Sequence, residues 1–258
     1  MEGLVDAFQR YFEVVLARTE EQVREAQRLR YQVYCLETGF EDPAAHPDGL
    51  ERDVYDARAV HSLLVHRPTG CVAGSVRLIL PDPEDLAAPF PLEEHCGVLW
   101  KAAPRGVRGR LGEISRFCIS RAFKRRLTEP GTVWGAPPDR WGRPPSDERR
   151  VIPHIVIGLI AGGIRLSGRS GVRHWYAVME PSLYRLLRRF AIDFEQIGPP
   201  VEYHGNRIPC YARVDAVMES MRRRRPALWD LATENGRWWP PREPPEQGVA
   251  GKPLTVDH

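Results

Sequence analysis

Residues 112–120 read Gly-Glu-Ile-Ser-Arg-Phe-Cys-Ile-Ser and lie near the middle of a chain of 258 residues. Polar and apolar side chains alternate along this stretch, which is the period of a β-strand. Glu113 and Arg116 stand three positions apart, so a regular strand would turn their side chains to opposite faces. A β-bulge between them would bring both charges to one face, and we predict such a bulge.

The segments before this strand predict a strand, a helix and a hairpin. Residues 12–17 form the first strand, and Thr19 caps the following helix, which has acidic residues in its first turn. This helix repeats apolar residues at spacings of three and four until Gly39, which is expected to end it. Residues 61–66 and 71–80 are apolar runs on either side of a turn-forming tetrapeptide, the arrangement of a β-hairpin.

The segments after it continue the mixture of strands and helices. Residues 152–167 are apolar enough for a buried helix. We further expect strands at 175–179, 194–197 and 211–217, and helices at 181–190 and 219–234, the last of them broken near Pro226. This order of elements indicates an α/β sandwich with a largely antiparallel sheet.

The composition narrows the class of protein. The chain has 37 basic and 34 acidic residues, and a net charge of +3 disfavours a nucleic-acid partner. Its five cysteines lack the spacing of a zinc site, so we expect no metal. Residues 1–11 have no apolar signal core and no segment suits a membrane span, which together with the odd number of cysteines favours the cytoplasm.

Prolines mark the domain organisation. They concentrate in residues 81–104, 130–153 and 237–258. The first two stretches flank the central strand as long loops. We expect a single domain over residues 1–236 and a loosely ordered tail over residues 237–258.

Several charged residues lie within segments whose helix or strand pattern is otherwise apolar. Arg30 and Tyr34 share one face of the first helix, and Arg77 lies in an apolar strand. The acidic loop that carries Glu51 adds further charges. The resulting set is balanced, with Arg30, Arg77 and Arg116 against Asp53, Asp56 and Glu113. Such a set can be partly buried because each charge has a partner, and a structural ion-pair network explains it at least as well as a catalytic site does.

The first half of the chain resembles the acyl-homoserine-lactone (autoinducer) synthases. The resemblance rests on several motifs in the same order and at matching spacings, namely Leu29–Tyr34, Phe40, Glu51–Asp56, Gly74–Leu78 and Gly112–Phe117. It covers roughly residues 12–120 and departs from that family at Phe40, where the family usually has tryptophan.

The second half resembles a different branch, the exosortase-associated (PEP-CTERM system) acyltransferases, which are similar to N-acyl amino acid synthases. The matching segments are Met179–Leu183, Arg185–Leu187, Ile197–Pro199 and Val201–Arg207. All three groups are GNAT-like enzymes. The resemblance therefore implies a three-layer sandwich with a mixed, mostly antiparallel central sheet, and transfer of an acyl chain from a thioester to an amine.

The resemblance also implies roles for particular residues. Glu113 would be the base, and Ser115 and Arg116 would complete the catalytic group. Backbone N–H groups of Phe117, Cys118 and Ile119 would stabilise the oxyanion. The substrate-binding residues would be Arg30, Tyr34, Phe40, Asp53, Asp56 and Arg77, with the carboxylates placed for an acceptor ammonium. For Glu113 an ion pair with an arginine is the structural alternative, and for Tyr34 and Phe40 it is packing in the core.

The acyl donor is expected to reach the enzyme as a thioester on acyl carrier protein or coenzyme A, with no bound cofactor. The basic residues Arg121, Lys124, Arg125 and Arg126 would dock an acidic carrier protein. Glycines at 158, 162 and 163 would admit an acyl chain, although helix–sheet packing explains them equally well. The two proline-rich loops would shape the acyl entrance. For Tyr203 and His204 we prefer a structural role.

Three functions follow from these expectations. The first is an N-acyltransferase that makes an N-acyl amino acid or a similar acyl amine. The second is an autoinducer synthase that uses S-adenosylmethionine and forms a lactone. The third is an inactive acyl-binding or carrier-docking protein, which the intact Glu113 and the charged set disfavour.

Overall fold

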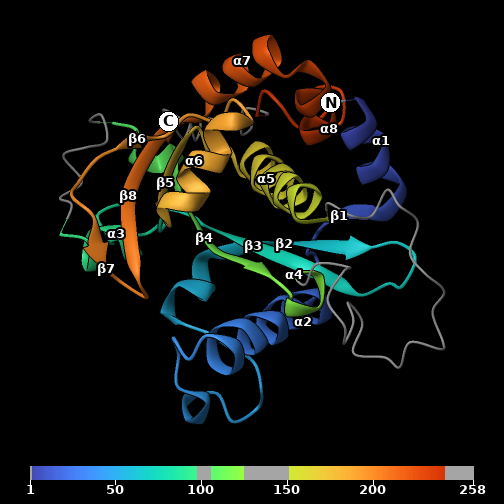
Figure 1. Ribbon diagram of the computed structural model, residues 1–258. Helices are drawn as coiled ribbons and strands as arrows, with labels where there is room; N and C mark the ends of the chain where they lie inside the picture. Colours follow the sequence, from blue (N-terminus) through green and yellow to red (C-terminus); the bar gives the residue numbers. More distant parts are fainter. Residues whose placement is uncertain (1, 98–105, 125–150, 242–258) are drawn as a thin grey trace, which may run out of the picture.

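The computed structural model describes residues 2–97, 106–124 and 151–241 (Figure 1). Its centre is one sheet in the strand order β1-β2-β3-β4-β5-β8-β6, with β7 paired to β8. The strands are β1 Phe12–Leu16, β2 Ala59–His66, β3 Val72–Ile79, β4 Leu111–Ile119, β5 His174–Met179, β6 Glu195–Gln196, β7 Val201–Glu202 and β8 Asn206–Arg213. Neighbours are antiparallel except β4 and β5, which confirms the mixed, mostly antiparallel sheet.

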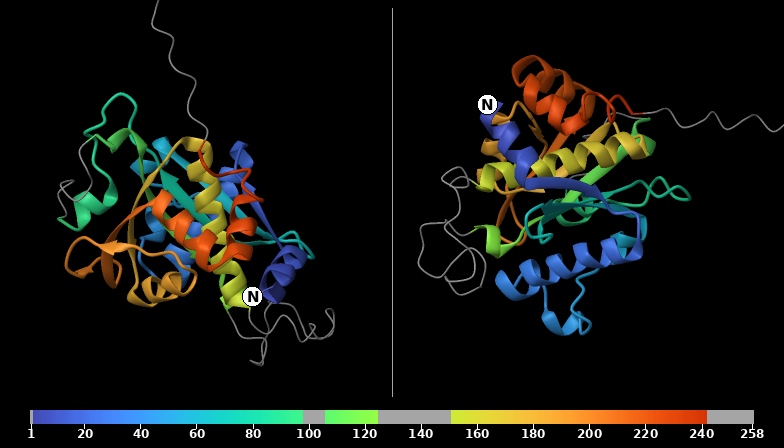
Figure 2. Two further views of the ribbon diagram at one scale, coloured as in Figure 1. Left: turned by 90° about the horizontal axis from the view of Figure 1, so that it is seen from above. Right: turned by 90° about the vertical axis from the view of Figure 1, so that its right-hand side faces the viewer.

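Helices cover both faces of the sheet, which confirms the three-layer sandwich (Figures 1 and 2). Helix α2, Glu20–Arg30, continues into a π-helix, Tyr31–Glu37, and lies on one face. The other face carries α5 with α1, α7 and α8. These helices are α1 Glu2–Tyr11, α5 Val151–Ser170, α7 Val214–Arg224 and α8 Pro226–Thr233. The described helices contain no segment with the length and apolarity of a membrane span.

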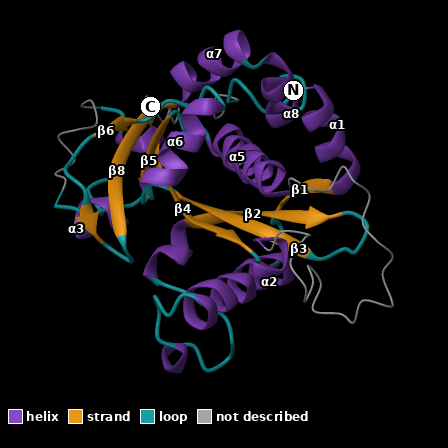
Figure 3. Ribbon diagram, in the orientation of Figure 1, coloured by secondary structure: helices purple, strands orange, loops and turns teal. Residues whose placement is uncertain are grey.

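The remaining helical segments are short and lie in the connections between the longer elements. They are α3 Pro91–His95, α4 Arg121–Lys124, α6 Pro181–Arg189 and the 3₁₀ turns Pro43–Ala45, Val54–Arg58 and Arg108–Arg110. The sheet is strongly twisted, so that β5 and β8 run steeply across the direction of β2 and β3 (Figure 3). This twist separates the two halves of the sheet at the boundary between β4 and β5.

Local sequence signals explain where α2 begins. Thr19 and Gln22 form a capping box, in which each side chain bonds the other residue's backbone N–H. The inner face of α2 then buries Ala26, Leu29 and Arg30 against the sheet. The arginine on this face needs buried partners, and they define the site described below.

Helix α5 forms the centre of the main core. It is buried along almost its whole described length and packs against β1, β2 and β3. A Cβ atom at Gly158 would meet Leu64, and one at Gly162 would meet Ser62, both on β2. These two glycines therefore serve helix–sheet packing, whereas Gly163 faces Ile114 of β4.

The strand near residue 213 and the end of the packed domain both differ from the sequence-based expectation. The strand expected at 211–217 spans Asn206–Arg213, and α7 begins at Val214. The reason is that polar Arg213 and Asp215 alternate with apolar residues across the junction, which imitates the period of a strand. At the C-terminal end, Trp239 is buried in the main core, so packed structure extends beyond residue 236.

We predict that Gly162→Val destabilises the fold. A side chain at this position would overlap Ser62 and Val76, and overpacking of a core typically costs about 1–3 kcal/mol. Urea unfolding followed by circular dichroism measures the free energy of unfolding. Gly109→Val is the matched control, because a Cβ at Gly109 has no atom within 4 Å. Equal stability of the two variants would contradict the packing role of Gly162.

Candidate active site

The parallel strands β4 and β5 separate partway along their length. Their ladder pairs Leu111–Ile114 with His174–Ala177. Beyond it, β4 continues to Ile119 with β3 as its partner. Over residues 115–119 the edge of β4 that faces β5 therefore has no strand partner within the described chain. This opening lies in the centre of the sheet, with α5 on one face and the α2 layer on the other.

A β-bulge lies at the start of this opening, at residues 116–117 and therefore slightly later than the expected position between Glu113 and Arg116. Ser115 pairs with Arg77 and Cys118 pairs with Ser75, so two residues of β4 stand opposite the single residue Val76 of β3. Arg116 occupies the bulge with φ +48°, a left-handed conformation that costs roughly 1–2 kcal/mol for a residue with a side chain. The bulge turns Arg116 to the face of Ser115 and Arg77, where partners offset that cost.

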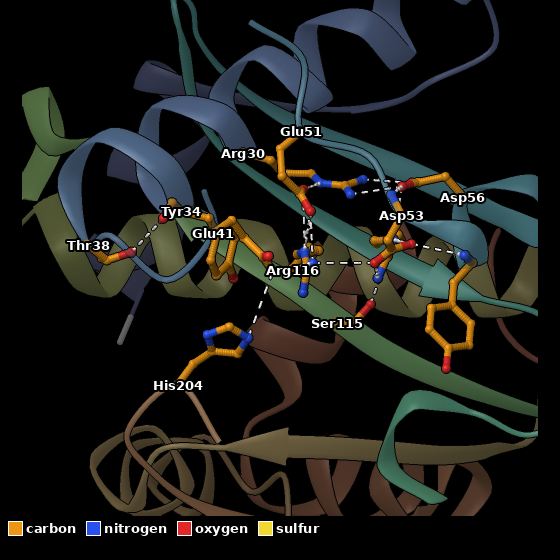
Figure 4. Close-up of polar contacts among 12 residues, drawn as sticks. Arg30, Tyr34, Thr38, Glu41, Glu51, Asp53, Asp56, Ser115, Arg116 and His204 are labelled. Carbon is orange, nitrogen blue, oxygen red and sulfur yellow. Dashed lines mark hydrogen bonds and ion pairs between the residues drawn. The ribbon is translucent and has the colours of Figure 1, made fainter. Parts of the chain in front are cut away.

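Buried charges gather on this face (Figure 4). The group, called here the charge cluster, consists of Arg30, Arg77, Arg116, Glu41, Glu51, Asp53 and Asp56. Its carboxylates come from the loop between α2 and β2, and its arginines come from α2, β3 and β4. Elements that are distant in sequence are thus held together by ion pairs.

Two of the arginines are completely engaged. Arg30 binds Asp56 through two hydrogen bonds of 2.6 and 2.8 Å and also donates from Nε to Glu51. Arg77 binds Asp53 through two hydrogen bonds of 2.6 and 2.9 Å. Its Nε donates to the Ser115 hydroxyl at 3.0 Å, so Ser115 orients Arg77. Both arginine side chains are only 1% exposed.

Arg116 is the more accessible arginine, with a side chain 12% exposed. Its Nη2 lies 2.8 Å from Glu51, 3.0 Å from Glu41 and 3.3 Å from Asp53. The guanidinium lies 4.9 Å from the ring centroid of Tyr34, within the range of a cation–π contact.

The cluster carries one more negative than positive charge. The guanidinium groups of Arg30 and Arg116 outweigh burial, which alone would raise the pKa of Glu51, and hold this pKa at about 2. His61 lies 3.4 Å from Asp56, but burial and the nearby Arg30 lower its pKa to about 4, so it is neutral at pH 7. Three guanidinium groups therefore face four carboxylates. The excess lies at the solvent edge, where the Asp53 and Glu41 side chains are 24% and 28% exposed.

Glu113 is not part of this cluster, which corrects the balanced set expected from sequence. Its side chain lies on the same face, and Oε2 accepts a hydrogen bond of 2.9 Å from the backbone N–H of Leu92. Within the described residues Glu113 has no ion pair, so the structural alternative of an arginine partner does not apply. Burial raises the pKa of Glu113 to about 8.

The first proline-rich stretch, residues 81–104, accounts for the burial of Glu113. Its described part contains α3, and Phe90 and Leu92 pack with Tyr176 in an apolar cluster on the Glu113 face. The described part of the stretch therefore covers Glu113. The second proline-rich stretch lies largely outside the described residues.

An apolar cavity lies on the opposite face of the opening. Its volume is about 90 Å³, and it lies between β4, β5, α5 and α6. The lining residues are Ile114, Ser115, Arg116, Phe117, Leu159, Ile160, Gly163, Trp175, Ala177, Val178, Met179, Leu183, Leu187, Ile192 and Phe194. β4 is thus bordered by an apolar cavity on one face and by the charge cluster on the other.

The remaining predicted residues lie around these two features. Tyr34 lies beside Arg116, and Phe40 lies 6.5 Å from Tyr34 between ring centroids. Cys118 is buried near α2, and Ile119 packs against the main core. Arg121 is exposed at the start of α4. Of the other expected docking residues, Arg125 and Arg126 lie outside the described residues, and the side chain of Lys124 is not described.

Sequence reasoning missed part of the site. Glu41 and Glu51 were not among the predicted binding residues, although Glu51 begins the acidic motif that suggested Asp53 and Asp56. Glu41 has no motif of its own. His204, assigned a structural role, lies 3.8 Å from Glu41 and 5.1 Å from the Phe40 ring, and the adjacent Tyr203 stacks on His95. The hairpin of β7 and β8 therefore borders the charge cluster.

Comparisons with known proteins agree with this fold. No curated protein sequence matches the chain. A family model described as an acetyltransferase (GNAT) domain matches residues 29–134.

Several solved structures superimpose on most of the chain. The acyl-homoserine-lactone synthase LasI is 16% identical, with a TM-score of 0.56 over 82% of this chain and 95% of LasI. FeeM, an N-acyl amino acid synthase from uncultured soil microbes, is 14% identical, with a TM-score of 0.51 over 81% and 93%. BjaI, a CoA-dependent acyl-homoserine lactone synthase, is 17% identical, with a TM-score of 0.54 over 87% and 88%. These matches confirm the expected GNAT-like fold and its likeness to both synthase groups.

We predict that burial of Glu113 makes the stability of the fold depend on pH. The unfolded carboxyl ionises near pH 4.5 and the folded one near pH 8, so the folded state binds the extra proton between these values. Stability is therefore lost as pH rises through this window, by up to about 1.4 kcal/mol per pH unit. Urea unfolding at pH 5, 6, 7 and 8 should show a shallower fall for Glu113→Gln than for the wild type.

The control for this comparison is Glu20→Gln, because the Glu20 side chain is 86% exposed. It should follow the wild-type dependence on pH. Parallel curves for the wild type and Glu113→Gln would show that Glu113 is not protonated in the folded protein at neutral pH.

Proposed function

We propose that this protein is an N-acyltransferase that moves a fatty acyl group from an acyl thioester to the amine of an amino acid or a similar small acceptor. The observation that carries the proposal is the opening between β4 and β5, with an apolar cavity on one face and the charge cluster and Glu113 on the other. The apolar acyl chain would occupy the cavity and the charged amine would lie at the charge cluster. The thioester carbonyl and the amine must meet for the amide bond to form.

The reaction is attack of the amine nitrogen on the thioester carbonyl. An α-amino group has a pKa near 8, so a large part of it is protonated at neutral pH. With a pKa of about 8, Glu113 is largely protonated at pH 7, and the ionised fraction, roughly a tenth, takes a proton from the amine, directly or through a water. The pKa of about 8 suits this task because a base works best when its pKa is near the working pH.

The tetrahedral intermediate carries a negative oxygen that needs hydrogen-bond donors. Residues 117–119 lie beyond the end of the β4–β5 ladder, and backbone N–H groups there are the proposed donors. Collapse of the intermediate breaks the carbon–sulfur bond. The products are an amide and a thiolate, which takes up one proton.

The charge cluster supports a positively charged acceptor. The exposed edge of the cluster carries the excess negative charge at Asp53 and Glu41, which favours an ammonium group. Arg30 and Arg77 are sealed by their own carboxylates, so an acceptor carboxylate would meet Arg116. An amino acid presents both groups.

The donor is proposed to be carried by acyl carrier protein. Arg121, Lys124, Arg125 and Arg126 stay part of this proposal as the docking residues, since a basic patch directly after β4 suits an acidic partner. The motifs of the second half favour the exosortase-associated branch, and the five free thiols favour a reducing compartment such as the cytoplasm.

The second candidate is an autoinducer synthase. The motifs of the first half favour it, because the same cluster would hold the amine of S-adenosylmethionine. Mass spectrometry of lipid extracts from cells that overexpress the protein separates the candidates. An N-acyl amino acid supports the proposal, and an acyl-homoserine lactone supports the alternative. Extracts identical to those from cells without the protein would favour the inactive acyl-binding protein.

We predict that Glu113→Gln lowers turnover by roughly 10²–10⁴-fold, the usual contribution of a general base. Glutamine keeps an oxygen that accepts the bond from Leu92, so the fold should be retained. Turnover is measured as acylated product formed from a purified thioester and amine, with circular dichroism as the check on folding. Glu20→Gln is the exposed control. Near-normal turnover of Glu113→Gln would remove it as the base.

We also predict that reversing the charge of Arg125 and Arg126 weakens binding of acyl carrier protein. The loss should shrink as salt is added, because exposed charges are screened. Titration of labelled carrier protein at two salt concentrations measures the effect. Reversal of Arg222 and Arg223, which are exposed on α7, is the matched control. An equal effect of both double variants would place docking elsewhere or make it nonspecific.

A further inference from the structure

We infer that Trp175 sets the length of acyl chain that the cavity accepts, and that Ser167 holds its indole in position. This inference rests on the proposed function and deepens it, because it concerns the donor side of the same site. It makes Trp175 a specificity-determining residue and Ser167 a positioning residue.

The position of Trp175 along β5 places it at the closed end of the cavity. β4 and β5 run in parallel and separate toward their C-terminal ends. Trp175 lies in the paired part, opposite Gly112, whereas Met179 lies at the open end. Trp175, Ala177 and Met179 are two residues apart, so they line the same face of the strand.

The exposure of the lining residues also indicates which end of the cavity is open. The lining residues Phe117 and Leu183 are partly exposed and mark the side that reaches solvent. Trp175 is 3% exposed and stacks on Phe194, with ring centroids 6.0 Å apart. The two aromatic rings therefore form the floor of the cavity.

Two buried hydrogen bonds fix the indole. Trp175 Nε1 donates to the Ser167 hydroxyl at 2.8 Å, and this hydroxyl donates to the Gly163 carbonyl at 2.8 Å. Rotation of the ring would leave a buried N–H without a partner, which disfavours other orientations of the indole. The floor is therefore a fixed wall and not a flexible side chain that a longer acyl chain could displace.

The dimensions suit a chain of limited length. Met179 and Trp175 are four residues apart, which is about 13 Å along a strand. Ala177 leaves room between them, and an extended chain that enters near Met179 meets the indole at the end of this run. The indole therefore limits how far an acyl chain can extend past Met179, and longer chains would be excluded by the ring.

The test is the acyl-length profile of Trp175→Leu. Acyl thioesters of increasing chain length are supplied with one amine, and product is measured by mass spectrometry. The ratio of product from chains two carbons beyond the wild-type optimum to product at that optimum should rise at least about tenfold, since one methylene in an apolar pocket is worth about 10–200-fold. Should Trp175→Leu fail to fold, Trp175→Phe should give a smaller shift in the same direction.

Two further variants separate the roles. Trp229→Leu on α8 is the matched control, since Trp229 is a half-buried tryptophan outside the cavity, and its profile should stay wild type. Ser167→Ala removes the anchor and should broaden the profile without moving its optimum. An unchanged profile in active Trp175→Leu would overturn the role of Trp175. An unchanged profile in Ser167→Ala would overturn the role of Ser167.

A binding measurement keeps this inference separate from the proposed function. Free fatty acids of the same lengths should raise the Tm of the wild type up to one length, and of Trp175→Leu up to a greater length. If no thioester yields a product but the Tm series shifts in this way, the acyltransferase proposal fails and the role of Trp175 stands. If products form and neither series shifts, the proposal stands and the role of Trp175 fails.

Discussion

The burial of three guanidinium groups is the constraint on which the rest of the site depends. Arg30 and Arg77 are almost inaccessible to water, and a buried charge without partners costs several kcal/mol. The partners come from one loop, whose carboxylates Glu51, Asp53 and Asp56 are fixed between α2, β3 and β4. Each of the three arginines pairs with at least two of the carboxylates, so the cluster fixes the loop, the helix and the two strands relative to one another.

The bulge at Arg116 connects this network to the opening in the sheet. A regular β4 would have turned Arg116 toward α5, where its partners would be apolar. The left-handed residue instead places the guanidinium over Glu51 and Tyr34 and leaves Phe117 to line the cavity. One irregular pair of residues therefore gives a single strand two different chemical environments, and it does so where β5 has already separated from β4.

Features set by short spacings could be predicted from sequence, and features set by distant contacts could not. The cap at Thr19, the hairpin and the alternation of β4 follow from neighbouring residues, as does the bulge. Glu41 joins the cluster through the path of a loop, for which no local pattern exists. Glu113 was expected among the arginines, but α3 folds over it and replaces an ion pair with a backbone N–H. The boundary of β8 was misplaced because Arg213 and Asp215 alternate with apolar residues across the junction of strand and helix.

The separation of the two faces of β4 has a consequence for the end of a catalytic cycle. Under the proposed function, a product made across the opening would be an amphiphile with its tail beside α5 and its polar head at the charge cluster. Such a molecule is threaded through the sheet, and neither half can leave alone. The tail must withdraw along β5 toward the open end while the head passes the bulge. Departure of such a product would be an ordered step, which a membrane or an amphiphile-binding protein that captures the emerging tail would assist.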